Sequence, residues 1–215
     1  MKSPIPDNAV QPGGMTCGDT TAMSSKYPTQ LSPILIDLDG DGVPVSSAES
    51  GVVFDIFADG VPVLVAWPDS SADAFLALDR DGSGTIDSGA ELFGNRTPLR
   101  SGDIAMNGFE ALAELDANGD GVVNSDDSGY ASLLICRDDD RNGWSAPSEL
   151  IGLAAAGVLE ISVQAKESRR RDRWGNLFLL RSWVNINGGR SFAYDVFLTW
   201  AAGGSVSASV VPCTR

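Results

Sequence analysis

The sequence contains no histidine among its 215 residues. Histidine is the commonest general base in enzymes and a common protein ligand of zinc and copper. Its absence excludes catalytic arrangements of the Ser-His-Asp and Cys-His kinds. The three cysteines, Cys17, Cys136 and Cys213, share no CxxC spacing. A structural zinc site is therefore not expected, and an enzyme is not expected either.

Long apolar runs are also missing, and the cysteines are few. No apolar run reaches the length of a transmembrane helix, so we expect no membrane span. The first residues lack the apolar segment of an intact signal peptide, so either a signal was removed or export uses another route. Cys17 and Cys213 lie near the two ends, as a disulfide or as free thiols, and Cys136 lies in an apolar stretch typical of a core.

Basic residues are scarce as well. Fifteen basic residues against 29 acidic residues give a net charge of −14. A chain this acidic repels nucleic acid and anionic membranes, so we expect no nucleic-acid partner. The acids are clustered, which indicates cations as partners. The single basic cluster, residues 169–173, indicates a solvated loop between strands, with a site for an anionic glycan or an acidic partner as the alternative.

One acidic pattern recurs three times between Asp79 and Glu149. The copies read DRDGSGTIDSGAE from Asp79, DANGDGVVNSDD from Asp116 and DDDRNGWSAPSE from Asp138. A helix-loop-helix calcium loop supplies oxygen atoms from positions 1, 3, 5, 7 and 9 and a bidentate acid from position 12, with glycine at position 6. The three copies follow that pattern, so the sequence predicts two to four bound calcium ions, counting a fourth, incomplete copy.

Each loop offers its own candidate ligands. In the loop from Asp79, where one extra residue precedes the closing acid, they are Asp79, Asp81, Ser83, the carbonyl of Thr85, Asp87 and Glu91. In the loop from Asp116 they are Asp116, Asn118, Asp120, the carbonyl of Val122 and Asp127, with Asn124 at position 9. In the loop from Asp138, where a water replaces Ala146, they are Asp138, Asp140, Asn142, the carbonyl of Trp144 and Glu149. The alternative for any single loop is a polar turn whose side chains bond the local backbone.

The incomplete fourth copy, DLDGDG, offers three acids at alternate positions: Asp37, Asp39 and Asp41. Its position 12 is Ala48, and Glu49 follows one place later. Both a cation site and a polar turn remain open for this copy. A weaker echo, DIFADG from Asp55, has Phe57 where a ligand should stand, which favours an ordinary hairpin turn.

Residues 1–30 are expected to form a flexible leader, and residues 31–215 a single calcium-binding α+β domain. Apolar and β-branched segments predict β structure at 31–78 and 158–200, with a hairpin turn at 187–189. In the calcium region, 79–157, apolar spacing and capping residues predict short helical segments at 91–94, 107–115, 128–135 and 147–156. The expected fold therefore has short helices and calcium loops in the middle, flanked by antiparallel β segments. We expect Ile86 and Val123 to meet where the first two loops pair.

The order of these segments resembles the EF-hand-like calcium-binding module of secreted bacterial RTX and iron-regulated toxin-like proteins. The resemblance rests above all on SGAELFG and NGDG and extends over roughly residues 32–200. It implies a secreted protein and an acid at the thirteenth place of the first full loop, which is Glu91. Some members cut an Asp-Pro bond in themselves when calcium binds, but this sequence has no Asp-Pro dipeptide and no GGxGxD repeats.

We therefore expect a secreted, non-enzymatic domain that calcium folds or rigidifies. Its partners would be calcium and either another protein or the rest of a larger secreted protein. Two alternatives stay open. One is a dockerin-like interaction module, because DANGDGVVNSDD resembles half of a dockerin, and the other is a calcium-triggered self-processing module.

Overall fold

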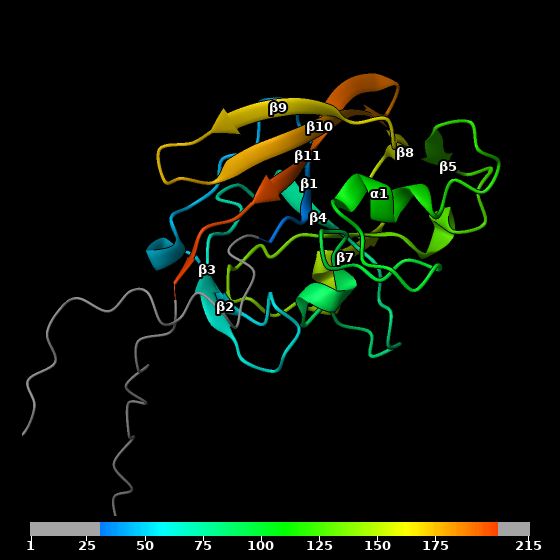
Figure 1. Cartoon of the computed structure of the whole chain (residues 1–215). Helices are drawn as coiled ribbons and strands as arrows, with labels where there is room; N and C mark the ends of the chain where they lie inside the picture. The colour runs from blue at the N-terminus through cyan, green and yellow to red at the C-terminus, as the bar shows by residue number, and fades with distance from the viewer. Residues whose placement is uncertain (1–30, 202–215) are drawn as a thin grey trace, which may run out of the picture.

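The computed structural model describes residues 31–201, so the expected leader, Cys17 and Cys213 lie outside the described residues. Most regular structure in this part is antiparallel β-sheet (Figure 1). The strands are β1 (Ile34–Asp37), β2 (Val52–Phe54), β3 (Val63–Val65), β4 (Asp73–Ala77), β5 (Val122–Asn124), β6 (Leu134–Cys136), β7 (Leu150–Gly152), β8 (Val158–Ser162), β9 (Lys166–Arg171), β10 (Leu177–Ile186), β11 (Gly189–Phe197) and β12 (Trp200–Ala201).

The expected α+β class is wrong. Within residues 31–201 there is one α-helix, α1 (Gly108–Ala113), which Asn107 caps by accepting the Glu110 N–H at 2.9 Å. The other helical segments are single 3₁₀ turns: η1 (Ala48–Ser50), η2 (Gly89–Glu91), η3 (Tyr130–Ser132) and η4 (Pro147–Glu149). The helices expected at 128–135 and 147–156 are each a 3₁₀ turn followed by a strand, β6 or β7. Their apolar runs are short, and pairing with β4 and with each other satisfies the backbone that a helix would otherwise have to satisfy.

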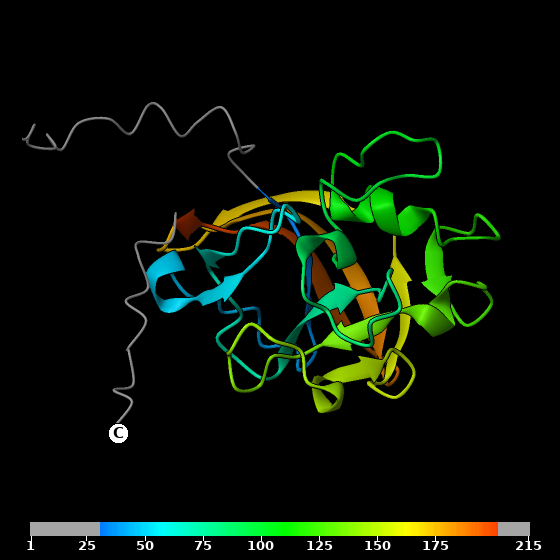
Figure 2. The same ribbon diagram turned by 90° about the horizontal axis from the view of Figure 1, so that it is seen from below.

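A nine-stranded sheet organises the molecule. Its order is β5-β8-β10-β11-β1-β4-β6-β7, with β9 also paired to β10, and the pairs are antiparallel. The longest pair, β10 with β11, is the hairpin that the turn at 187–189 predicts. In the view of Figure 2 this large sheet is strongly curved. Because β5, β6 and β7 belong to the same sheet as β1, the middle of the chain is not a separate helical unit.

Alternation along the central strands divides the core into two clusters. Leu35 of β1 lies opposite Phe75 of β4 and Tyr194 of β11, and all three belong to one cluster. A small sheet, β12-β3-β2, contributes to the same cluster through Val52, Val63 and Val65. Residues of alternate parity on the central strands belong to the second cluster, together with residues of α1. These alternate positions are Ile34, Ile36, Ala74, Leu76 and Ala193.

The basic cluster at 169–173 is not a plain loop, because most of it lies in strand β9. Arg170 stacks over the Phe178 ring at 3.7 Å from its centroid, which helps to hold this edge strand against β10. In the part of the chain that the structure covers, no helix has the length and apolar character needed to cross a membrane.

Cys136 has the expected place in the core, where it is 5 % exposed. Burial, with the nearby carboxylates of Asp138, Glu149 and Glu91, raises the pKa of its thiol to about 12. We therefore expect a Cys17→Ser/Cys213→Ser variant not to react with a disulfide reagent at pH 8 (a pH well below that pKa) until it is unfolded in urea, because the thiolate is the reactive form. Spectrophotometric thiol counting measures this. Rapid reaction of the folded protein would contradict the burial.

Candidate metal centre

The acidic loops share one backbone geometry. In the loop from Asp79, the first carboxylate accepts the N–H of Gly82 at 2.8 Å and of Gly84 at 3.0 Å. In the loop from Asp116, it accepts the N–H of Gly119 at 2.8 Å and of Gly121 at 2.9 Å. Corresponding bonds form from Gly143 to Asp138 at 2.8 Å and from Gly42 to Asp37 at 3.1 Å. Each loop is thus wound around its first aspartate.

Positions 4 and 6 of these loops have positive φ angles. Glycine stands at both positions in the loops from Asp37, Asp79 and Asp116. In the loop from Asp138, position 4 is Arg141, with φ of 55°, and position 6 is Gly143. The reversed backbone turns the intervening side chains toward one centre, so the glycine spacing in the sequence has a direct conformational cause.

The closing acid of each full loop is buried: Glu91 is 3 % exposed, Asp127 4 % and Glu149 6 %. Each reaches back across its loop to the N–H at position 9. Glu91 accepts the Asp87 N–H at 2.9 Å, Asp127 the Asn124 N–H at 3.0 Å and Glu149 the Ala146 N–H at 2.7 Å. Asp127 and Glu149, which stand at position 12, also accept the N–H at position 2 of their loops, at 2.7 Å and 2.8 Å respectively. The closing acids therefore occupy equivalent places in all three loops.

None of these buried acids forms an ion pair with a basic side chain within residues 31–201, although the charge of Glu91 acts on the Arg80 guanidinium. The ion pairs within residues 31–201 are Arg137–Asp139, Arg141–Asp69 and Arg169–Glu167, and none includes a closing acid. Glu91 Oε1 is buried without any hydrogen-bond partner in this part of the chain. Burial raises the pKa of Glu91 and also that of Asp138. A buried carboxylate with an unused oxygen is costly unless a cation compensates it.

Carboxylate oxygens converge within 4.8 Å of one another at three of the loops. The groups are Asp37 with Asp39 and Asp41, Asp79 with Asp81 and Glu91, and Asp138 with Asp140 and Glu149. In the loop from Asp116, the third position is Asn118, whose Nδ2 donates to Asp120 at 3.0 Å. Oxygen donors of this kind and spacing suit a hard divalent cation and not a soft one, so the residues present fit calcium.

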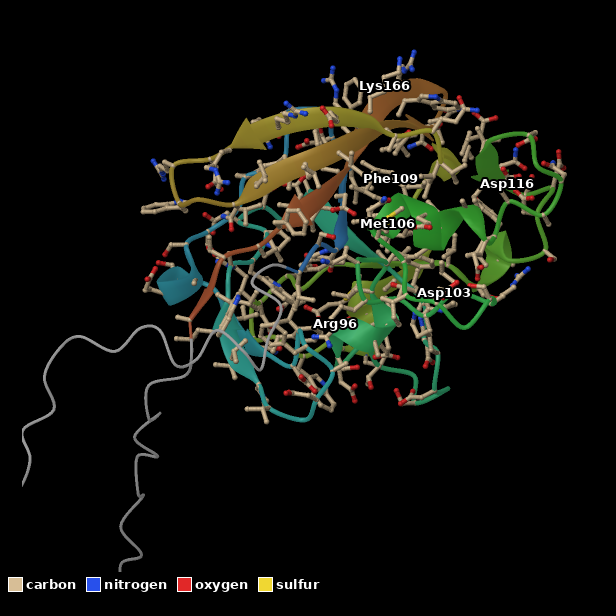
Figure 3. The ribbon with its side chains drawn as sticks, in the orientation of Figure 1. Arg96, Asp103, Met106, Phe109, Asp116 and Lys166 are labelled. Atoms are coloured by element: carbon tan, nitrogen blue, oxygen red, sulfur yellow. The ribbon has the colours of Figure 1, made fainter. Side chains whose placement is uncertain are left out.

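The structure places every predicted ligand on one of these four loops. First-position acids are half-buried or buried, whereas Asp39, Asp81, Asn118 and Asp140 at position 3 are exposed. Position 5 is also exposed in the described loops: Asp41, Ser83, Asp120 and Asn142. Position 7 supplies Thr85, Val122 and Trp144, and Asp87 at position 9 is exposed as well. In Figure 3, Asp116 lies near β5 toward the edge of the molecule.

Two loops contact each other through their eighth positions. The Ile86 N–H donates to Ser145 Oγ at 2.6 Å, and Ser145 Oγ donates to the Ile86 carbonyl at 3.3 Å. The first full loop therefore pairs with the third. The expected contact of Ile86 with Val123 is wrong, because the two residues belong to different core clusters. Val123 lies instead in β5, opposite Ile161 of β8.

The DIFADG segment joins β2 to β3, as the sequence predicts. Its backbone nevertheless follows the other loops, because Asp55 accepts the N–H of Gly60 at 2.8 Å and both Ala58 and Gly60 have positive φ. Phe57, at position 3, is buried and packs edge-on against Trp200 with ring centroids 5.0 Å apart. An aromatic side chain in the core thus stands where the other loops present an oxygen.

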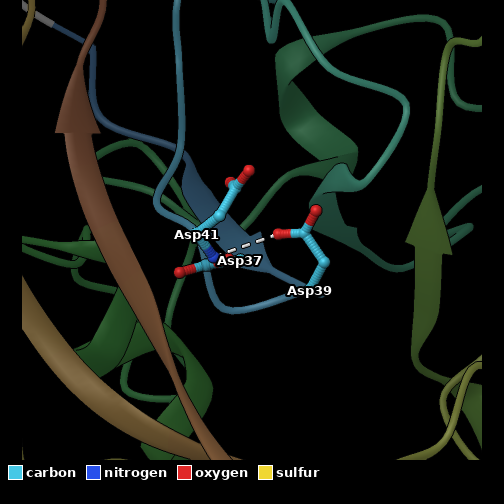
Figure 4. A group of neighbouring side chains, drawn as sticks. All are labelled: Asp37, Asp39 and Asp41. Carbon is cyan, nitrogen blue, oxygen red and sulfur yellow. Dashed lines mark hydrogen bonds between the residues drawn. The ribbon is translucent and has the colours of Figure 1, made fainter.

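The acids of the shortened loop, Asp37, Asp39 and Asp41, gather at the end of β1 (Figure 4). Sequence reasoning missed a fourth acid there, Asp73, the first residue of β4, which pairs with Asp37 in the register. Burial, followed by the charges of the three loop acids, raises the pKa of Asp73 to about 8. The burial of Asp73 could have been predicted from the sequence, because Asp73 alternates with Phe75 and Ala77 and so shares their buried face.

The profile of the SPM domain matches residues 34–199, which is nearly the whole described part. The chain belongs to the SPM domain family. The iron-regulated protein FrpA of Neisseria meningitidis serogroup C is 37 % identical over 155 residues. Those residues are 71 % of this chain and 14 % of FrpA, so the SPM domain described here spans a small part of that relative's length.

Proposed function

We propose that this SPM domain is a non-enzymatic, secreted calcium-binding domain that calcium folds or rigidifies. The observation that carries the proposal is the set of three closing acids, which are buried in equivalent places and form no ion pair among the described residues. A bound calcium ion would compensate each of these acids and the half-buried aspartate at the start of its loop. The net charge of −14 supports the same conclusion, because it opposes folding until cations are bound.

Bound calcium would hold neighbouring segments of the sheet together. The loop from Asp79 leaves β4 and ends at η2, and the loop from Asp138 leaves β6 and ends at η4 before β7. Fixing each closing acid to its first aspartate holds the exit of the loop against its start. At low calcium the same acids repel one another, so the chain stays loose enough to be exported and then folds outside the cell.

The partner that this proposal favours is the rest of a longer secreted protein. FrpA is much longer than the region that it shares with this chain, which supports a role for the domain as one module among others. The dockerin-like alternative receives no such support, because the loops from Asp116 and Asp138 adjoin strands of the central sheet. Without an Asp-Pro dipeptide, self-processing is not part of the proposal.

Calorimetric titration of the protein with calcium tests the proposal. We expect two to four equivalents to bind, and the midpoint of thermal unfolding to rise on going from chelator to saturating calcium. One site at 100 times its dissociation constant adds about 2.7 kcal/mol to the free energy of unfolding. Magnesium at the same ionic strength is the control, because it demands a smaller, more regular oxygen shell. Identical unfolding in chelator and in calcium, with no binding heat, would refute the proposal.

A further inference from the structure

Asp73 is the one buried acid in residues 31–201 for which neither carboxylate oxygen has a hydrogen-bond partner there. The residue is 2 % exposed. It is not a member of any of the ion pairs in this part of the chain. An aspartate in this position costs several kcal/mol if it remains charged and uncompensated. A cation bound beside it would allow the carboxylate to stay charged in the folded molecule.

The sheet directs Asp73 toward the shortened loop. Asp73 of β4 lies opposite Asp37 of β1, and residues opposite each other in an antiparallel pair project from the same face, with Cβ atoms about 5 Å apart. The charged groups that act on Asp73 are those of Asp37, Asp39 and Asp41. The unpartnered carboxylate thus faces three other carboxylates whose oxygens already converge within 4.8 Å (Figure 4).

The shortened loop lacks a closing acid of its own. Position 12 is the buried Ala48, and the next residue, Glu49, lies in η1 with its side chain exposed. Hydrogen bonds from its own backbone N–H and from Ser47 lower the pKa of Glu49, so this acid is occupied locally. In the full loops the closing acid is 3–6 % exposed, and Asp73 matches that burial. Asp73 therefore has the environment of a closing acid without belonging to the loop.

We propose that Asp73 closes a fourth calcium site with Asp37, Asp39 and Asp41, supplying from the neighbouring strand the ligand that this loop lacks. The inference rests on the proposed function. Four carboxylates would give this site as many acidic ligands as the loop from Asp79 offers, and such a set prefers a hard divalent cation. Because Asp37 ends β1 and Asp73 begins β4, the ion would fasten two adjacent strands in the centre of the large sheet.

The test is the number of calcium ions bound by Asp73→Leu, measured by calorimetry beside the wild-type chain. Leucine is larger than aspartate but offers no oxygen and suits a buried position, whereas asparagine could still offer an oxygen to calcium. We expect the variant to bind one equivalent fewer. The matched control is Glu49→Gln, which removes the acid that spacing alone would choose, and it should keep the full number.

The outcomes separate the two proposals. If wild-type protein binds no calcium, the proposed function fails. If wild type binds calcium and Asp73→Leu binds as many equivalents with equal affinity, only the role of Asp73 fails. Should Asp73→Leu not fold, nuclear magnetic resonance of wild-type protein with ¹³C-labelled aspartate replaces it. The carboxyl carbons of Asp73 and Asp37 should then shift together during the titration, and an unchanged Asp73 signal would overturn the inference.

Discussion

Replacing Gly89 by alanine is expected to lower the free energy of unfolding by at least about 3 kcal/mol. A Cβ atom at this position would lie 2.0 Å from the carbonyl oxygen of Ile56 and 2.7 Å from its carbon, and both atoms belong to the backbone. The Gly89 N–H also donates to the Asp55 carbonyl at 2.9 Å. A side chain here must therefore push apart the β2–β3 connection and the exit of the loop from Asp79.

The clash should also reach the candidate metal centre. Gly89 begins the 3₁₀ turn that ends at Glu91, so a displaced backbone would move the closing acid away from Asp79. Urea unfolding and calorimetry at saturating calcium measure both effects. Gly152→Ala is the matched control, because no atom lies within 4 Å of its added Cβ and its stability should change by less than about 1 kcal/mol. Equal stability of the two variants would contradict this account.

Asp195→Asn is expected to make the protein more stable at alkaline pH. Asp195 is fully buried in β11, accepts the Gly108 N–H, and keeps Oδ1 without a partner among the described residues. Burial raises the pKa of its carboxyl from 3.8 to about 7. The unfolded chain therefore releases this proton at lower pH than the folded chain. As a result, the contribution of Asp195 to stability falls as the pH rises from about 4 to about 7.

A shift of this size corresponds to about 4 kcal/mol above pH 7. The asparagine variant avoids that loss because its amide stays neutral while its oxygen still accepts the Gly108 N–H. Urea unfolding at pH 5 and pH 8, in saturating calcium, should show the stability difference between variant and wild type growing with pH. Asp103→Asn, which removes the same charge from an exposed position, should show no such growth. A constant difference for Asp195→Asn would contradict the linkage.

The chemistry of the loops could be read from the sequence, because it is local. Glycine at position 6 of all four loops and at position 4 of three of them sets the backbone, and the acids stand at alternate positions around these glycines. The extra residue before Glu91 is also evident from the sequence, and the structure has a 3₁₀ turn, Gly89–Glu91, at that point of the loop. The β10–β11 hairpin could also be predicted, since a two-glycine turn joins two runs of β-forming residues.

The architecture between the loops could not be read in the same way. The segment at 128–135 has helix-like spacing, yet Ile135 is held in β6 opposite Leu76 and Ile151, which lie far from it in sequence. The pairing of loops depends likewise on Ser145 reaching Ile86, and neither loop specifies that partner locally. The arginine-rich strand β9 has poor intrinsic β propensity and forms because β10 offers it an edge.

The position of β1 beside β11 has a consequence for the order in which the chain can fold. The Ser191 hydroxyl donates to the Asp37 carbonyl at 2.6 Å across 154 residues of sequence. The centre of the sheet therefore cannot close until almost the last described strand has left the ribosome or a translocation channel. Such long-range contacts make folding slow. The first acidic loop to emerge is thus among the last to be enclosed, and folding of this region is slowed by topology as well as by repulsion among its acids.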